Sequence, residues 1–489
     1  MTSLQRSFGI LLHPTSLPGH FGVGDIGPEA HRFLELLRSS GAAYWQVLPL
    51  GPPGEGNSPY QARSSFAGHP LLVPLEPLVE EGLLAASELE PMESGAAADF
   101  AAAARVRFRA LRTAYGRWRP DEEFERFREA AAWWLRDYAL FAALKERDPR
   151  GWWEWPAELV RREPDALARA EEALAEEVRF QAFVQFRFEQ AWRALRRRAS
   201  ELGVRLIGDV PFFPALDSAD VWANQWAFKL DEHGRPRFVA GVPPDAFSAT
   251  GQLWGNPVYR WEALRERGYS WWLERLRRTF ELFDVTRIDH FRGFAAAWEI
   301  PAGSPTAVEG AWVPGPGFEF FERVRAELGE LEIIVEDLGL ITEDVRELQR
   351  RVGYPGMYVL QFAFDSDARN PYLPHNHERN AVVYTGTHDN DTTRGWWEAL
   401  PPERRAYVSR YLGHEPADPV AALLRLALAS VATLAVLPWQ DVLGLGSEAR
   451  MNVPGRPHGN WGWRFRWEQL PEGRLQWLAE LAALYGRSG

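Results

Sequence analysis

Four acidic residues follow short apolar runs in the sequence, at positions where buried strands would end. They are Asp209, Asp289, Glu336 and Asp389. A single acid at the end of a strand is usually solvated or paired with a base. Because an unpaired buried charge is unfavourable, several acids brought to one rim of a fold would indicate a catalytic or binding site.

Two of these acids have sequence neighbours that would shift their carboxyl pKa values in opposite directions. Arg287 and Asp289 are two residues apart on a predicted strand, so both face the same way, and the guanidinium would keep Asp289 ionised as a nucleophile requires. Glu336 follows Ile-Ile-Val without a basic neighbour, a setting that raises a carboxyl pKa and suits a general acid. Such a pair is typical of glycosidases, which retain the anomeric configuration at a carboxyl separation of ~5 Å and invert it at ~6.5–9.5 Å. The sequence leaves that separation open.

The elements that would position these acids are eight short β-branched runs, each followed by helical material. Runs of this kind, bounded by Gly or Pro, are typical of strands buried on both faces of a parallel sheet. They cover residues 8–13, 44–48, 204–210, 285–290, 331–336, 357–362, 381–385 and 434–438. Eight such strands predict an α/β fold, a (β/α)8 TIM barrel whose strand ends converge on one mouth. A doubly wound sheet is the alternative.

The spacing of the runs predicts one catalytic domain over 1–489 with two insertions. Residues 75–202, between the second and third strands, are rich in Ala, Glu, Arg and Leu, which predicts a mostly helical subdomain. Residues 214–261, between the third and fourth strands, contain a predicted hairpin at 228–238 and a loop rich in Gly and Pro. Both insertions leave from the strand ends where a barrel builds its site.

Composition narrows the classes of function. The chain has 489 residues, a net charge of −12 and no cysteine, which excludes disulfides, thiolate nucleophiles and Cys-ligated metals. The acidic balance argues against duplex nucleic acid or an anionic membrane as a partner. No apolar run approaches the ~20 residues of a membrane span, and the N-terminus is a poor signal peptide, so we expect a cytoplasmic protein.

The 23 tryptophans of the chain are compatible with a sugar ligand, because pyranose rings stack their C–H faces on aromatic rings. Trp254 lies in a polar loop, where an aromatic side chain is not explained by core packing alone. Trp133, Trp134, Trp271 and Trp272 lie on helical patterns, and packing is the simpler interpretation for them.

Nine motifs spread over nearly the whole chain carry a resemblance to a known family. They are GILLHPTSLP (9–18), WQVLPLGP (45–52), SPYQ (58–61), GDVP (208–211), PPDAFS (243–248), RIDHFRG (287–293), EDLG (336–339), THDNDT (387–392) and HGNW (458–461). With these motifs the chain resembles the 4-α-glucanotransferases (amylomaltases or disproportionating enzymes) of glycoside hydrolase family 77, in the α-amylase superfamily.

The resemblance implies residue roles. Asp289 would be the nucleophile, Glu336 the general acid/base and Asp389 the transition-state stabiliser. The positions that match substrate-binding residues of the family are Tyr60, Asp209, Arg287 and His388 at the donor sugar, and Phe247, Gln252, Trp254 and Asn460 along the glucan groove. Ala246 departs from the aromatic residue of some relatives. No cofactor and no metal are implied.

The implied reaction is a double displacement through a covalent glucosyl-enzyme, with maltooligosaccharides, amylose or glycogen-derived α-1,4-glucans as substrates and neither nucleic acid nor membrane as a partner. Transfer to the 4-hydroxyl of a second glucan is favoured by the resemblance and by aromatic loops that could exclude water. Two alternatives remain open: a retaining hydrolase of the same superfamily and a non-catalytic glucan-binding protein.

Three other patterns are weighed against simpler interpretations. The glycines of 22–27 satisfy G-x-G-x-x-G, but no acid ends the next strand, so turn geometry is preferred to nucleotide binding. His375 and His377 lack a third metal ligand nearby. Asp337 should face away from Glu336, since adjacent residues of a strand alternate sides.

Overall fold

Eight parallel strands form the centre of the computed structural model, which describes residues 4–92, 95, 97–244, 248–339, 341–456 and 458–488. Their order around the sheet is β10-β11-β12-β1-β2-β3-β6-β9. The strands are β1 (Ser7–Leu11), β2 (Tyr44–Gln46), β3 (Arg205–Val210), β6 (Val285–Ile288), β9 (Ile333–Val335), β10 (Gly356–Val359), β11 (Ala381–Tyr384) and β12 (Leu434–Pro438).

The two ends of this sheet come together at β9 and β10. The N–H of Val335 donates a 2.9 Å hydrogen bond to the carbonyl of Pro355, just before β10, so the sheet forms a nearly closed barrel. The predicted TIM barrel with inserted subdomains is confirmed, and the doubly wound sheet was wrong. Several predicted strands ran one to three residues past their observed ends; the last residues of 357–362 turn into a short 3-10 helix (Leu360–Phe362).

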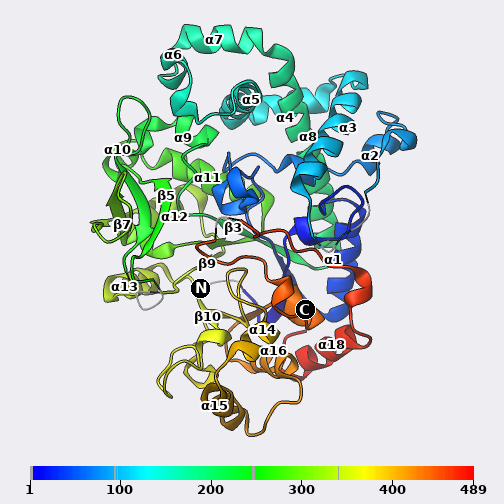
Figure 1. Ribbon diagram of the computed structural model, residues 1–489, viewed down its shortest axis with the longest axis vertical. Coiled ribbons are helices and arrows are strands. Elements are labelled where there is room, and N and C mark those ends of the chain that lie inside the picture. Colours follow the sequence, from blue (N-terminus) through cyan, green and yellow to red (C-terminus); the bar gives the residue numbers. More distant parts are fainter. Residues whose placement is uncertain are drawn as a thin grey trace.

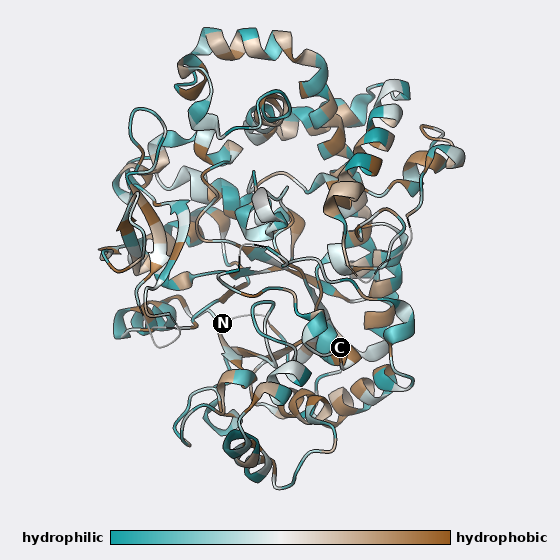
Figure 2. Cartoon of the chain, in the orientation of Figure 1, coloured by the Kyte–Doolittle hydropathy of each residue, from teal (hydrophilic) through white to brown (hydrophobic). Residues whose placement is uncertain are grey.

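The barrel strands are buried on both faces, which explains why their sequences read as continuous apolar runs (Figure 2). The first outer helix, α1 (Pro28–Ser40), begins at a proline and ends at Gly41 in the left-handed conformation. Its residue Phe33 packs edge-on against Trp45 of β2, with ring centroids 5.0 Å apart. The other helices of the outer layer are α11 (Ser270–Leu282), α12 (Gly317–Leu328), α13 (Glu343–Val352), α14 (Thr393–Ala399), α15 (Pro402–Leu412), α16 (Pro419–Ala429), α17 (Trp439–Leu443) and α18 (Arg474–Leu484).

Helices fill the connection between β2 and β3 and stand above the barrel in Figure 1. They are α2 (Glu76–Glu80), α3 (Phe100–Arg117), α4 (Glu122–Ala130), α5 (Ala132–Arg147), α6 (Ala157–Val160), α7 (Pro164–Ala173) and α8 (Ala175–Glu201). The long helix α8 leads the chain back to the barrel. Across the described ranges, none of the helices combines the length and the apolar character needed to cross a membrane.

The glycine-rich loop at 22–27 is where this helical region contacts the first barrel loop. Gly22 has a φ of 81°, and Arg107 of α3 donates to the carbonyl of Val23 and to the carboxylate of Asp25. A Cβ on Gly24 would lie 2.2 Å from the carbonyl oxygen of Pro14. The glycines therefore serve close backbone packing.

A second, smaller sheet flanks the barrel on the left of Figure 1. Its four antiparallel strands run in the order β5-β4-β7-β8, and they and the helices near them are β4 (Phe238–Val242), β5 (Gln252–Pro257), β7 (Ala296–Pro301), β8 (Ala311–Pro314), α9 (Ala219–Ala223) and α10 (Trp261–Glu266). The hairpin predicted at 228–238 is a tight turn in which Leu230 bridges Pro236. The wider sheet was not predicted, because its strands β4 and β7 pair directly although the barrel strand β6 lies between them in the sequence.

Candidate active site

The predicted acids lie at the carboxyl end of the barrel. Asp209 lies within β3 and is the register partner of Arg287 in β6. Asp289 directly follows β6, Glu336 directly follows β9, and Asp389 lies in the loop after β11. Because parallel strands place their carboxyl ends on one rim, residues far apart in sequence meet in one mouth.

Arg287 joins two of the carboxylates. Its Nη1 donates to both oxygens of Asp209, at 2.9 and 2.8 Å, and its Nη2 donates to Oδ1 of Asp289 at 2.7 Å. Burial opposes the charge of Arg287, but Asp209 and Asp289 together raise its pKa. The Asp209 side chain is fully buried whereas that of Asp289 is 32% exposed. Asp289 is therefore the carboxylate of this pair that a ligand can reach.

Glu336 has different surroundings. Its Oε2 accepts a 2.8 Å hydrogen bond from the N–H of His290, and its Oε1 accepts a 2.7 Å hydrogen bond from the N–H of Leu338. Removal from bulk water raises the pKa of Glu336 to about 7, and the nearby charge of Asp289 contributes to the rise. Asp337 turns the other way and accepts from the N–H of Met357. The register thus places Glu336, and not Asp337, toward Asp289.

Aromatic rings cover the Asp209 and Asp389 side of the mouth. Tyr60 stacks on His388 with ring centroids 4.9 Å apart, and its hydroxyl donates a 2.8 Å hydrogen bond to Asp209. Nε2 of His388 lies 3.4 Å from Oδ1 of Asp389. Burial lowers the pKa of His388, so the imidazole is neutral over the physiological range. The result is a rigid wall of neutral polar groups and carboxylates that suits the hydroxyls of a sugar.

The predicted groove residues divide into three groups. Trp254 packs edge-on against His290 at 4.8 Å, and its indole N–H donates to Oε1 of Gln252, so these two residues flank the acids. Asn460 bonds to Val453 and to the carbonyl of Arg456 within its own loop. Phe247 lies outside the described residues, as does Ala246.

Three residues near the acids were missed by sequence reasoning. His290 has a φ of 54°, a left-handed conformation, and its N–H donates to Glu336. Trp461 lies 5.9 Å from both Tyr60 and His388, ring to ring. Nδ2 of Asn452 donates a 2.6 Å hydrogen bond to Oδ1 of Asp389. His290 and Trp461 adjoin predicted residues, whereas no sequence signal marks Asn452.

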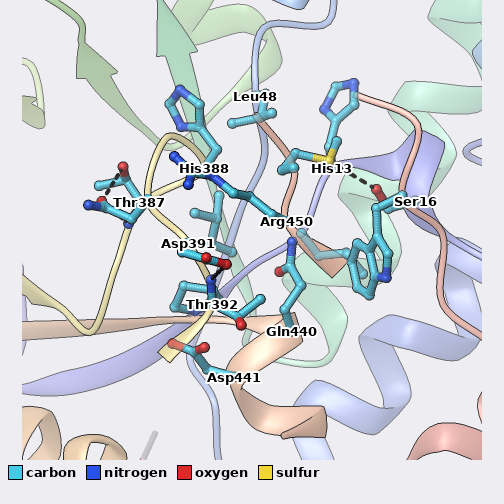
Figure 3. Close-up of a pocket in the computed structure, with 16 residues that line it drawn as sticks. His13, Ser16, Leu48, Thr387, His388, Asp391, Thr392, Gln440, Asp441 and Arg450 are labelled. Atoms are coloured by element: carbon cyan, nitrogen blue, oxygen red, sulfur yellow. Dashed lines mark hydrogen bonds between the residues drawn. The ribbon is translucent and has the colours of Figure 1, made fainter. Parts of the chain in front are cut away.

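His388 also lines a small cavity, which Figure 3 shows in close-up. Thr387, Asp391 and Arg450 line it, together with His13, whose pKa is lowered to about 3 by burial. Its lining contains none of Asp209, Asp289, Glu336 and Asp389, so we assign this cavity to the support of the 387–391 loop and not to the sugar site. Within the described ranges, no three His, Asp or Glu side chains are arranged to hold a metal ion.

Comparison with known proteins agrees with this architecture. The sequence profile of the family described as 4-alpha-glucanotransferase, glycoside hydrolase family 77, matches residues 12–470. The chain is 52% identical over 495 residues to the 4-alpha-glucanotransferase of Thermus thermophilus, covering 98% of this chain and 99% of that one. It is 44% identical over 501 residues to the chloroplastic/amyloplastic 4-alpha-glucanotransferase of Solanum tuberosum, covering 99% and 87%.

A solved structure extends the comparison to three dimensions. The amylomaltase of Streptococcus agalactiae, determined in complex with acarbose, superposes with a TM-score of 0.96 at 36% identity, covering 99% of this chain and 100% of that one. This chain belongs to glycoside hydrolase family 77, the family of the 4-α-glucanotransferases. The family expected from the motifs is confirmed, and with it the enzymatic activity of the family.

Proposed function

We propose that this 4-α-glucanotransferase works by retaining double displacement, with Asp289 as the nucleophile, Glu336 as the general acid/base and Asp389 as the stabiliser of the oxocarbenium-like transition state. The observation that carries these roles is the difference between the surroundings of the two carboxyl groups. Asp289 is paired with Arg287, whereas the pKa of Glu336 is raised to about 7. Glu336 can therefore retain a proton to donate, and the guanidinium of Arg287 lies where it holds the Asp289 side chain in place.

In the first step Glu336 gives its proton to the glycosidic oxygen of the donor, and a carboxylate oxygen of Asp289 bonds to the anomeric carbon as the glycosidic bond breaks. The leaving glucan departs with the proton. Arg287 orients the Asp289 carboxylate through its 2.7 Å hydrogen bond, and its hydrogen bonds to Asp209 limit how far the guanidinium can move. The product is a β-linked glucosyl-enzyme.

The second step reverses these roles. The negative charge of Asp289 is one of the causes of the raised pKa of Glu336. Formation of the ester removes that charge. The pKa of Glu336 then falls, and the carboxylate accepts the proton of the incoming 4-hydroxyl while that oxygen attacks the anomeric carbon. A new α-1,4 bond forms and Asp289 is released. Since one α-1,4 bond replaces another, the exchange needs no external energy source.

The wall beside the acids would hold the donor sugar. His388 and Asp389 would present a neutral imidazole and carboxylate oxygens toward the ring hydroxyls, with Tyr60 beside them. The fully buried Asp209 would act behind them, by holding Tyr60 and Arg287 in place. Trp254 and Gln252, on the small sheet, would hold the acceptor glucan and keep water away from the ester. We propose Phe247 and Asn460 as further groove residues on the family motifs.

The substrates proposed are maltooligosaccharides, amylose and glycogen-derived α-1,4-glucans. The complex of the Streptococcus agalactiae amylomaltase with acarbose supports a ligand of this type. The net charge of −12 supports neutral sugar chains over polyanions such as nucleic acid.

The test is to incubate the purified protein with maltotriose alone and follow the oligosaccharide ladder. Transfer gives glucose together with maltopentaose and longer chains. Glucose and maltose alone would show that water intercepts the intermediate, which is the hydrolase alternative. An unchanged maltotriose pool would indicate a binding protein. The Asp289→Ala variant is the control, because loss of the nucleophile removes the covalent path and lowers turnover by several orders of magnitude.

A further inference from the structure

A loop after the last barrel strand makes three hydrogen bonds to the segment of His388 and Asp389, two of them to Asp389 itself. The N–H of Asn452 donates to the carbonyl of His388 at 3.1 Å, and Nδ2 of Asn452 donates to Oδ1 of Asp389 at 2.6 Å. Nη2 of Arg450 donates to the main-chain carbonyl of Asp389 at 2.7 Å. Figure 3 shows Arg450 reaching from its own loop toward the segment of Thr387 and His388.

Arg450 also fixes the residue that contacts the carboxylate. Its Nε donates a 2.7 Å hydrogen bond to the carbonyl of Asn452, so one guanidinium spans the two loops. Farther along, the N–H of Trp461 donates to the carbonyl of Met451, and the Trp461 ring packs near Tyr60 and His388. The loop is therefore anchored on both sides of Asn452.

We propose that Asn452 is a positioning residue for the Asp389 carboxylate and that Arg450 holds Asn452 in register. The proposal rests on the role proposed above for Asp389. The side chain of Asp389 is 47% exposed, and besides the amide of Asn452 its near polar neighbour is Nε2 of His388, 3.4 Å away. Without the amide donor, this carboxylate would be free to rotate toward water, and the geometry that stabilises developing positive charge on the sugar would be lost.

The first test compares Asn452→Ala with wild type and Asp389→Ala in the maltotriose assay. A hydrogen bond to a charged group corresponds to about a ten- to hundredfold effect, so kcat of Asn452→Ala should fall by that factor with KM changed less than about threefold. The kcat of Asp389→Ala should fall by a larger factor than that of Asn452→Ala. Arg450→Met should reproduce part of the Asn452→Ala loss, because Asn452 then loses its anchor.

The second test uses Asn452→Asp, which keeps the shape and places a second carboxyl at hydrogen-bond distance from Asp389. When ionised, that carboxyl repels Asp389; when protonated, it donates as the amide does. The ratio of variant to wild-type activity should therefore rise as pH falls. The other titratable groups that face Asp389 are His388 and Tyr60, with Arg287 and Asp289 next to them, and all are present in both proteins, so the ratio isolates the new carboxyl.

Asn380→Asp is the matched control, since the exposed Asn380 donates to the carbonyl of Gly353 far from the acids. Its activity ratio to wild type should be flat with pH. The inference is overturned if Asn452→Ala keeps kcat within about twofold, or if the Asn452→Asp ratio is flat, while Asp389→Ala is inactive. Activity retained by Asp389→Ala would instead overturn the role of Asp389 itself, and the inference with it. Melting curves of each variant verify that folded proteins are being compared.

Discussion

The main-chain N–H of His290 donates a 2.8 Å hydrogen bond to Oε2 of Glu336, and His290 itself has a left-handed φ of 54°. The N–H of Leu338 binds the other oxygen. The carboxyl group is thus fixed in orientation by main chain on both sides, next to Asp289. A general acid held in this way needs no rearrangement when the glycosidic oxygen arrives.

The first prediction concerns pH. Because removal from water and the charge of Asp289 raise the pKa of Glu336 to about 7, the fraction of protonated acid falls as pH rises through that value. kcat/KM for maltotriose should decline on the alkaline side of about pH 7. With a maltosyl fluoride donor, whose leaving group needs no proton, this alkaline decline should disappear. A decline of the same size with the fluoride would assign the ionisation to another group.

The second prediction concerns Arg287. A lysine cannot span Asp209 and Asp289 with two nitrogens, so Arg287→Lys should lower kcat/KM by about a hundredfold or more and reduce the melting temperature. Arg205→Lys is the matched control, because Arg205 lies at the opposite end of the barrel as the first residue of β3. Steady-state kinetics of both variants provide the measurement. Comparable losses in the two would contradict a specific role for Arg287.

The sequence predicted the barrel well because each barrel strand is buried on both faces and so appears as an apolar run. It did not predict the small sheet, whose strands carry Gly and Pro and in which β4 pairs with β7, although the barrel strand β6 lies between them in the sequence. The predicted length of 357–362 was wrong for a related reason: apolar character continues past Val359 into a buried turn. Burial is visible in a sequence, but the partner of a strand is not.

The site shows the same division. Arg287 and Asp289 could be paired from their spacing, because two residues on one strand face one way, and the structure places their charged atoms 2.7 Å apart. The contact of Asn452 with Asp389 joins residues 63 positions apart on different loops, and no local sequence pattern predicts it. The positive φ of His290 is likewise imposed by the fold.

The third prediction concerns the balance between transfer and hydrolysis. Trp254→Ala removes the ring that packs against His290 beside the acids, which opens the acceptor side to water. The ratio of hydrolysis to transfer, measured as reducing ends produced per glucose released from maltotriose, should rise severalfold. Trp133→Ala is the control, since the 44% exposed Trp133 lies on α5 of the helical region. Equal ratios in wild type and Trp254→Ala would contradict the acceptor role.

The fourth prediction concerns stability. Arg107, fully buried on α3, bonds to Asp25 at 2.7 Å and ties the helical region to the first barrel loop. Arg107→Met leaves a buried carboxylate unpaired and should lower the free energy of unfolding by about 3–5 kcal/mol. Arg112→Met, on the same helix, breaks an exposed ion pair with Glu146 and should change it by less than about 1 kcal/mol. Urea unfolding of both variants measures the two changes in the free energy of unfolding. Similar changes would show that the buried ion pair stabilises the protein no more than the exposed one.

The central claim is the covalent bond to Asp289, and the most direct measurement is to trap it. The protein is incubated with a fluorinated maltosyl fluoride whose enzyme ester breaks down slowly, then digested and mapped by mass spectrometry. We expect one added fluoromaltosyl group, located on Asp289, in wild type, and no such group in Asp289→Ala. A sugar found on another residue, or an unlabelled enzyme that still turns over maltotriose, would contradict it.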